Sequence, residues 1–234
     1  MENIENIKRA LGASKMIYDA VRASLREGVS EREIYDLVGK TAGELLRDQQ
    51  WEYIGDFVSG ERTAEIGGDA TDRKMKPGDL FILDLSFRCG DGWCDTCRTF
   101  FLGEPSEEIR RAYDTVLRCQ RVGELAVRPG VKASDIKLVM EAFMVSQGYG
   151  GHMPHHGGHG VGNAPYEKPA FEETCDMPVE EGKVITLEPG LYFENRFGIR
   201  VENNYLVREN GLVNIFDYPR ELEYFIITGE RLEK

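Results

Sequence analysis

The sequence lacks several features that would place it in other classes of protein. It has no apolar run approaching the roughly 20 residues that cross a bilayer, so no membrane span is expected. Its N-terminus, MENIENIKRALG, is too charged for a signal peptide. Positive charge is in deficit, because the formal net charge is −12, which argues against nucleic acid or an anionic membrane as a partner. Its five cysteines are odd in number and follow no secretory signal, which predicts reduced thiols and a cytoplasmic protein.

The chain is long enough, at 234 residues, for one domain with a sizeable core. Apolar residues recur at helical spacing in four segments, and Ser30 with Glu33 forms a capping-box signal at the start of the second. Strand patterns lie between and after these helices. Helices are expected over 2–26, 30–47, 105–127 and 133–147, and strands over 53–59, 80–89, 93–101, 183–188, 198–207 and 223–228, with a polar loop over 60–76.

A predicted hairpin holds two aspartates in apolar strands. In LFILDLSFRCGDGWCDTCRTFF, residues 80–101, a Gly-Asp-Gly turn separates two apolar runs, one with Asp84 and the other with Asp95. The two aspartates are expected roughly opposite each other, about 5 Å apart at Cβ. Burying two like charges at that distance is costly unless an opposite charge compensates. The pattern therefore favours a bound cation over two solvated acids.

An internal repeat places two further acids in corresponding positions. REGVSEREI (26–34) matches RPGVKASDI (128–136), and KPGDLFILD, ending at Asp84, matches EEGKVITLE, ending at Glu188. Asp95 has a looser counterpart in Glu202, within GIRVENNYLV. The repeat predicts two α+β halves that each contribute a pair of carboxylates from strands.

All four histidines lie within 152–159, in a glycine-rich stretch that is either a metal-binding segment or a flexible loop. Next to four embedded acids, the metal-binding interpretation is the stronger. One imidazole with several carboxylates suits Mn, Fe, Co or Zn. Four carboxylates are too many for one ion, whereas two ions about 3.5–4 Å apart would neutralise them. Two such ions bridged by hydroxide would provide a nucleophile at neutral pH.

Five motifs resemble the creatinase/aminopeptidase, or pita-bread, family, which includes methionine aminopeptidase, aminopeptidase P and prolidase. They are TDRKMKPGDLFILDLS, CDTCRTF, PHHGGHGVG, ITLEPGLYF and GIRVENNYLV, and together they extend over nearly the whole chain. The resemblance implies an α+β fold of two pseudo-symmetric halves, with a curved mixed or antiparallel sheet covered by helices. It also implies a single catalytic domain over 1–234, without the additional N-terminal domain of aminopeptidase P and prolidase.

The resemblance further implies roles for individual residues. Two divalent ions, from among Mn, Co, Fe and Zn with Mn favoured, would be the cofactors. Asp84 would chelate one ion, His159 and Glu188 would bind the other, and Asp95 and Glu202 would bridge both. Glu188 would also shuttle a proton, and Arg200 would support a ligand. His155 would be the first histidine of the family's H-x-x-x-H motif.

Two departures from the family pattern concern the substrate site. Active peptidases carry a histidine in the loop before TDR, where this chain has Gly67 or Gly68. They carry another histidine seven residues after the ligand histidine, where this chain has Tyr166. In the family both histidines contact the substrate or the transition state. Because Tyr166 takes the position of one of them, we expect it to have a catalytic role, as we do for Glu188, His155 and Arg200.

The leading hypothesis is therefore a cytoplasmic dinuclear metallohydrolase that resembles Xaa-Pro aminopeptidase and prolidase. It would cleave a peptide or amide-like C–N bond with metal-bound hydroxide. One alternative is a non-peptidase relative, a creatinase-like hydrolase or lyase acting on a small molecule. Another is a catalytically silent binding module, although retention of all five ligands weighs against it. The expected partners are a peptide or small-molecule substrate and a second copy in a homodimer.

Overall fold

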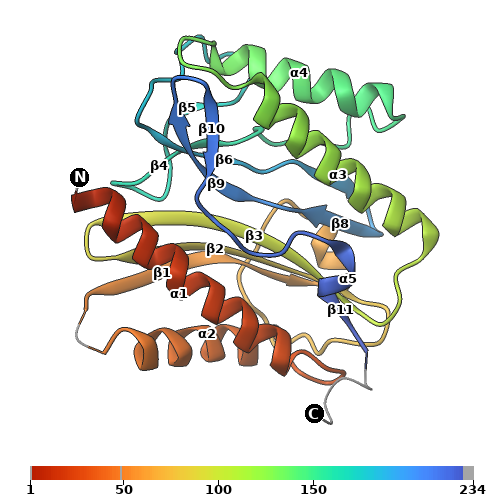
Figure 1. Ribbon diagram of the computed structural model, residues 1–234. Helices are drawn as coiled ribbons and strands as arrows, with labels where there is room; N and C mark the ends of the chain where they lie inside the picture. The colour runs from red at the N-terminus through yellow and green to blue at the C-terminus, as the bar shows by residue number, and fades with distance from the viewer. Residues whose placement is uncertain (1, 48, 229–234) are drawn as a thin grey trace.

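The first half of the chain packs two helices against one face of an antiparallel sheet (Figure 1). The computed structural model describes residues 2–47 and 49–228. Ser30 caps the second helix through the capping box with Glu33 that the sequence predicts. The elements are α1 (Glu2–Ser24), α2 (Glu31–Leu45), β1 (Trp51–Ser59), the 3₁₀ helix η1 (Gly60–Ala64), β2 (Leu80–Cys89) and β3 (Gly92–Leu102).

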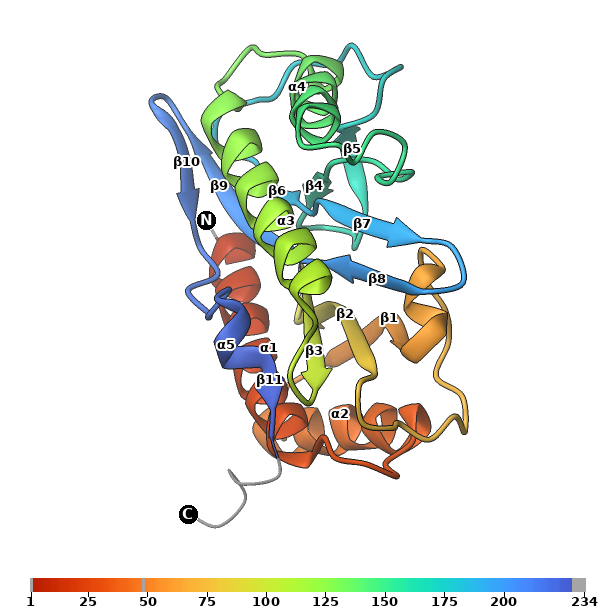
Figure 2. The same ribbon diagram turned by 90° about the vertical axis from the view of Figure 1, so that its right-hand side faces the viewer.

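The second half repeats the arrangement, with two helices outside a second sheet (Figure 2). Its helices are α3 (Glu107–Ala126) and α4 (Ala133–Ser146). Its strands are β4 (His159–Val161), β5 (Glu167–Ala170), β6 (Val184–Leu187), β9 (Asn203–Arg208) and β10 (Gly211–Asn214), with β7 (Gly190–Phe193) and β8 (Phe197–Arg200) as a separate hairpin. None of the helices in the described residues is long and apolar enough to span a membrane.

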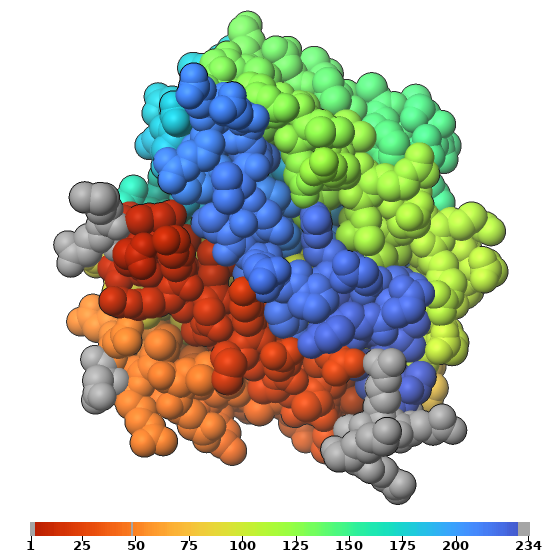
Figure 3. Space-filling model, viewed as in Figure 1, coloured from red at the N-terminus to blue at the C-terminus, as the bar shows by residue number. Residues whose placement is uncertain are grey.

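The last described residues cross back to the first sheet. They form a short helix, α5 (Leu222–Phe225), and a two-residue strand, β11 (Ile226–Ile227), which pairs in parallel with β3. In the space-filling view this C-terminal segment, in blue, lies between the red α1 and the green α3 (Figure 3). The two halves are therefore joined by the chain's end as well as by the connection from β3 to α3.

Equivalent backbone hydrogen bonds confirm the internal repeat. The turn before α2 pairs with a downstream segment through Gly28 N–H to Met75 O at 2.9 Å. The turn before α4 pairs in the same way through Gly130 N–H to Val179 O at 2.8 Å. The offsets between these residues, 102 and 104, equal those of the sequence repeat. The two halves thus share one local architecture.

Some predicted strands are corrected by the structure. Residues 198–207 form two strands, β8 and β9, because the chain breaks at Glu202, whose backbone pairs instead with Cys97 of β3. Of residues 223–228, the first three belong to the helical turn α5 and only Ile226–Ile227 form a strand, β11. The loop over 60–76 contains η1. The strands β4, β5, β7 and β10 were not predicted, because they are only three or four residues long.

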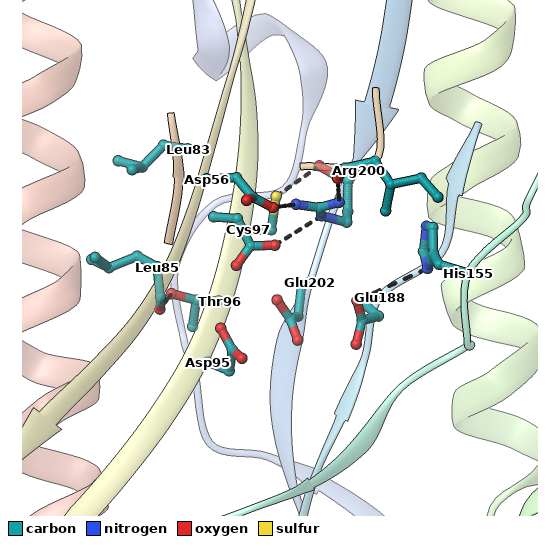
Figure 4. Close-up of polar contacts among 12 residues, drawn as sticks. Asp56, Leu83, Leu85, Asp95, Thr96, Cys97, His155, Glu188, Arg200 and Glu202 are labelled. Carbon is teal, nitrogen blue, oxygen red and sulfur yellow. Dashed lines mark hydrogen bonds and ion pairs between the residues drawn. The ribbon is translucent and has the colours of Figure 1, made fainter. Parts of the chain in front are cut away.

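The hairpin has the predicted turn but a register shifted from the expected one. Asp84 lies opposite Cys97 and Asp95 lies opposite Ser86, so the two aspartates are diagonal neighbours on one face rather than directly opposed. Leu83 and Leu85 point away from that face (Figure 4), toward the core with α1. The alternation along the strand therefore places both carboxylates between the two halves of the molecule.

Candidate metal centre

Five side chains from both halves meet between the two sheets. Asp84 comes from β2 and Asp95 from β3, while Glu188 follows β6, Glu202 joins β8 to β9, and His159 begins β4. In the close-up, the carboxylates of Asp95, Glu202 and Glu188 point toward one shared space (Figure 4). Ligand atoms of Asp95, His159 and Glu202 lie within 4.8 Å of one another. The structure thus brings together Asp95, His159 and Glu202, while Glu188 forms a second such group with His155 and His156, and Asp84 lies beside Arg200 outside both groups.

The hydrogen bonds of His159 define which of its ring nitrogens faces the acids. Its Nδ1 lies 2.8 Å from the carbonyl oxygen of Gly160, which can only accept, so Nδ1 carries a proton. Burial lowers the pKa of His159, which favours the neutral ring. Nε2 then presents a lone pair 3.6 Å from Asp95 Oδ2 and 3.4 Å from Glu188 Oε1. Three electron-rich atoms facing one another are stabilised by a cation between them.

The carboxylates are costly to bury without such a cation. Oδ1 of Asp95 and Oε1 of Glu202 are buried without a hydrogen-bond partner. Burial, reinforced by the neighbouring acids, raises the pKa of both carboxyls well above its usual range. Burial also raises the pKa of Asp84 to about 6, although Arg200 opposes the shift. The oxygen-rich donor set with one imidazole fits divalent ions such as Mn, Fe, Co or Zn.

Hydrogen bonds from neighbouring strands orient the ligand side chains. Ser86 donates its hydroxyl to Asp95 Oδ2 at 2.8 Å. The hydroxyl of Thr186 accepts the His159 backbone N–H at 3.1 Å and donates to Glu188 Oε1 at 3.3 Å. Gly158 permits this approach, because a Cβ there would lie 2.2 Å from the Thr186 carbonyl oxygen. The glycines of the histidine segment therefore let His159 lie directly against β6.

Arg200 contacts Asp84 and a second acid that sequence reasoning missed. Its Nε lies 2.8 Å from Asp84 Oδ2, and its Nη2 donates to Asp56 Oδ2 at 2.6 Å. Its Nη1 donates to the hydroxyl of Tyr192 at 2.8 Å. Asp56 is directly opposite Asp84 in the pairing of β1 with β2. The sequence feature that could have indicated this contact is the acid within the strand segment WEYIGDFVS. Asp56, the four carboxylate ligands and Arg200 carry four negative charges in total, which two divalent ions balance.

Two more histidines lie beside Glu188. His155 donates Nδ1–H to the carbonyl oxygen of His156 at 2.7 Å, and burial lowers its pKa to about 4. His156, which sequence reasoning did not assign, has its Nδ1 3.2 Å from Glu188 Oε1. Burial alone would raise the pKa of Glu188, but the imidazoles outweigh it and lower this pKa to about 2. The adjacent histidines in PHHGGH were the signal for this contact.

The two departures from the family pattern lie at the edge of the centre. The ring of Tyr166 is 4.8 Å from that of His159 and 5.6 Å from that of His156, between centroids, and the residue is 44% exposed. Of the two glycines, Gly67 faces Asp56, because a Cβ there would lie 2.5 Å from Asp56 Oδ1. Tyr166 is thus in reach of incoming molecules, while the space beside Gly67 is already filled.

Comparison with known proteins identifies relatives along nearly the whole chain. Residues 5–209 match the model of metallopeptidase family M24. The chain is 31% identical to a Xaa-Pro dipeptidase of Pyrococcus furiosus, over 94% of this chain and 63% of that protein. It is 32% identical to a putative dipeptidase, YkvY, of Bacillus subtilis, over 86% of this chain and 55% of that protein. The chain therefore spans about three fifths of the length of these relatives.

Solved structures show the same similarity in three dimensions. The X-Pro aminopeptidase of Thermotoga maritima superposes with a TM-score of 0.89 at 30% identity, over 97% of this chain and 63% of that one. The Pyrococcus furiosus prolidase superposes with a TM-score of 0.87 at 30% identity, over 93% and 64%. The expected pita-bread fold is thereby confirmed. On the extent of the family match and on these relatives, the chain belongs to metallopeptidase family M24.

Proposed function

We propose that this chain is a dinuclear metal-dependent hydrolase that cleaves the C–N bond of a Xaa-Pro dipeptide or a related amide. The observation that supports it most is the convergence of Asp95, His159 and Glu188, in which His159 Nε2 lies 3.6 Å from Asp95 Oδ2 and 3.4 Å from Glu188 Oε1. Two divalent ions would bind here and supply a water acidic enough to act as a nucleophile at neutral pH. The many oxygen donors favour Mn among Mn, Co, Fe and Zn.

Each proposed role follows from the position of the side chain. Asp84 would hold one ion and be oriented by Arg200, which contacts it at 2.8 Å. Asp95 and Glu202, each with a carboxylate oxygen that is buried without a hydrogen-bond partner, would help to hold the pair of ions. His159 would hold the other ion together with Glu188. Glu188, ionised because of its low pKa, would accept the proton of the attacking water.

Two further residues would act on the substrate rather than on the ions. His155 has a buried Nε2 with no hydrogen-bond partner, and that nitrogen would accept a hydrogen bond from the substrate. Tyr166, exposed beside the imidazoles, would donate its hydroxyl to the developing oxyanion. Neither residue takes the place of the histidine that is expected at position 67 in peptidases of the family.

One observation favours a second candidate, a creatinase-like hydrolase or lyase for a small molecule. The Asp56 carboxylate fills the space that a side chain at Gly67 would need. That acid, although paired with Arg200 at 2.6 Å, stands next to the position where we expect a peptidase of the family to have a histidine. A small substrate carrying a positive group would be better matched to this edge of the centre than a neutral peptide would be.

A substrate screen on Mn- and Co-loaded protein separates the two candidates. Xaa-Pro dipeptides would be compared with small amidines and betaines, with Asp95→Ala protein as the inactive control. Release of free proline would support the leading proposal, and turnover of the small molecules alone would support the second. Loaded protein that holds two ions and turns over neither class would contradict both.

Cellular location and assembly belong to the same proposal. The described cysteines are buried and unpaired, as expected for reduced thiols in the cytoplasm. We propose a cytoplasmic protein whose partners are its peptide or small-molecule substrate and a second copy of the chain. Sedimentation of the metal-loaded protein tests the homodimer.

A further inference from the structure

His156 lies on the boundary between the metal centre and a cavity of about 400 Å³. The cavity is also lined by Lys137, Glu141, Met153, His155 and Glu172. The side chain of His156 is 29% exposed, whereas those of His155 and His159 are 7% and 5% exposed. Of these three imidazoles, His156 is therefore the one that both contacts Glu188 and faces the opening.

The distances around Glu188 Oε1 are those of ligands that share one ion. When two ligand atoms each bind an ion at about 2.1 Å, with bond angles between 90° and tetrahedral, they lie about 3.0–3.4 Å apart. Glu188 Oε1 is 3.4 Å from His159 Nε2 and 3.2 Å from His156 Nδ1. Both imidazole nitrogens thus stand at ligand separation from the same carboxylate oxygen.

A direct hydrogen bond from His156 to Glu188 is the alternative explanation of the 3.2 Å contact. Such a bond needs the N–H to point close to the acceptor. His156 Nδ1 forms an ion pair with Glu188 that stabilises the charged carboxylate, but the contact does not satisfy hydrogen-bond geometry, so the carboxylate oxygen lies off the axis of this nitrogen. Two ligands of one ion have that relationship, since each points at the ion rather than at the other.

We propose that His156 Nδ1 is an additional ligand of the ion held by Glu188 and His159. This rests on the proposed two-ion function and refines the donor set of that centre. Ligand atoms of His155, His156 and Glu188 lie within 4.8 Å of one another, but His155 is not included, because its Nδ1 donates to a carbonyl oxygen and its Nε2 lies against Gly190. A second imidazole among the carboxylates shifts the selectivity of this ion toward Zn and Co and away from Mn.

The test compares metal selectivity, not turnover, in the full chain. Metal-free protein would be titrated with Zn²⁺ and with Mn²⁺ against a chromophoric chelator, and the visible spectrum of the Co²⁺ form would be recorded. His156→Leu removes the donor atom. His156→Asn places an amide oxygen near the position of Nδ1 and so keeps a donor that suits Mn. His152→Asn is the matched control, because His152 lies in the same segment and its Nδ1 donates to the Tyr192 carbonyl oxygen at 3.0 Å.

In His156→Leu the ratio of Zn²⁺ to Mn²⁺ affinity should fall by about tenfold or more, a loss typical for groups supporting a metal site. His156→Asn should lose Zn²⁺ affinity while keeping Mn²⁺ affinity, and its Co²⁺ spectrum should change. His152→Asn should match the unchanged protein. If both His156 variants kept the original ratio and spectrum, the proposal would be overturned; if His156→Leu did not fold, His156→Asn would decide. Failure of the unchanged protein to bind any ion would instead overturn the two-ion function itself.

Discussion

A Cβ atom on Gly67 would lie 2.5 Å from Oδ1 of Asp56, so the two residues compete for one volume. The Asp56 carboxylate is fixed there by Arg200 at 2.6 Å and by the backbone N–H of Gly68 at 2.9 Å. A histidine at position 67 therefore requires the acid to move or to be absent. The Asp56 carboxylate thus occupies the space that a side chain at position 67 would need.

The first prediction concerns this pair. Gly67→His should lower the free energy of unfolding by roughly 1–3 kcal/mol, the usual cost of inserting atoms into occupied space. In an Asp56→Ala background the same substitution should cost less, because the clashing carboxylate is gone. Denaturant unfolding of the four proteins of this double-mutant cycle measures the coupling. Additive effects would show that the two positions do not compete.

The second prediction concerns the stability of metal-free protein as pH changes. The pKa values of Asp95 and Glu202 are raised well above their usual range, and that of Asp84 is raised to about 6. Between the unfolded pKa of about 4 and these values, the folded state holds protons that the unfolded state has lost. Stability from these groups is thus present below pH 4 and is lost as pH rises through 6. Glu188 has the opposite sign, since its pKa of about 2 means that its contribution is lost only in acid. The lowered pKa values of His155 and His159 also oppose the trend, because the unfolded chain binds protons at these residues up to about pH 6.5, so the three acids have to outweigh them.

Melting of chelator-treated protein at a series of pH values measures this dependence. The melting temperature should fall as pH rises from about 4.5 to 7. Mn²⁺ or Co²⁺ should raise it again at the upper end, because an ion at one hundred times its dissociation constant adds about 2.7 kcal/mol per site to the free energy of unfolding. If the stability of the metal-free protein rose steadily up to pH 7, the proposed repulsion among the buried carboxylates of Asp84, Asp95 and Glu202 would be contradicted.

The third prediction separates repulsion from ligation at Asp95. Asp95→Asn keeps the shape of the side chain but removes a buried negative charge whose Oδ1 has no partner. Metal-free Asp95→Asn protein should melt higher than the unchanged protein near pH 7, yet gain much less from added Mn²⁺. The exposed Asp217→Asn is the control for charge alone. Equal gains from Mn²⁺ in Asp95→Asn and unchanged protein would mean that Asp95 binds no ion.

The sequence allowed prediction of the parts of this centre that depend on local pattern. Asp84 and Asp95 are visible because strand alternation places them among apolar neighbours, and Glu188 is visible through the repeat. The diagonal register of the hairpin was not visible, since it depends on which residues form the turn. The break at Glu202 depends on pairing with Cys97, far away in the chain. Asp56 and His156 were missed for the same reason, because each acquires its role only through contact with another element.

The last prediction concerns Tyr166, at the position where we expect peptidases of this family to carry a histidine. Its ring lies against those of His159 and His156, and its exposure leaves it accessible to a bound substrate. A phenol donates a hydrogen bond at neutral pH but does not exchange a proton as readily as an imidazole does. Without imidazoles at both family positions, cleavage of ordinary Xaa-Pro dipeptides should be weaker by roughly 100-fold or more than in a peptidase that has them.

Two substitutions test that account on metal-loaded protein. Tyr166→Phe should lower kcat on the true substrate by roughly 100-fold, the effect of removing one donor to a developing oxyanion, while metal content stays unchanged. Tyr166→His should raise cleavage of Xaa-Pro dipeptides, because it places an imidazole, which can donate a proton near pH 7, beside His159 and His156. Tyr35→Phe, at an exposed ring outside the centre, should change neither activity. The account would be wrong if the protein cleaved Xaa-Pro dipeptides as fast as a peptidase with both histidines and if Tyr166→Phe left kcat unchanged. The hydroxyl of Tyr166 would then take no part in the reaction.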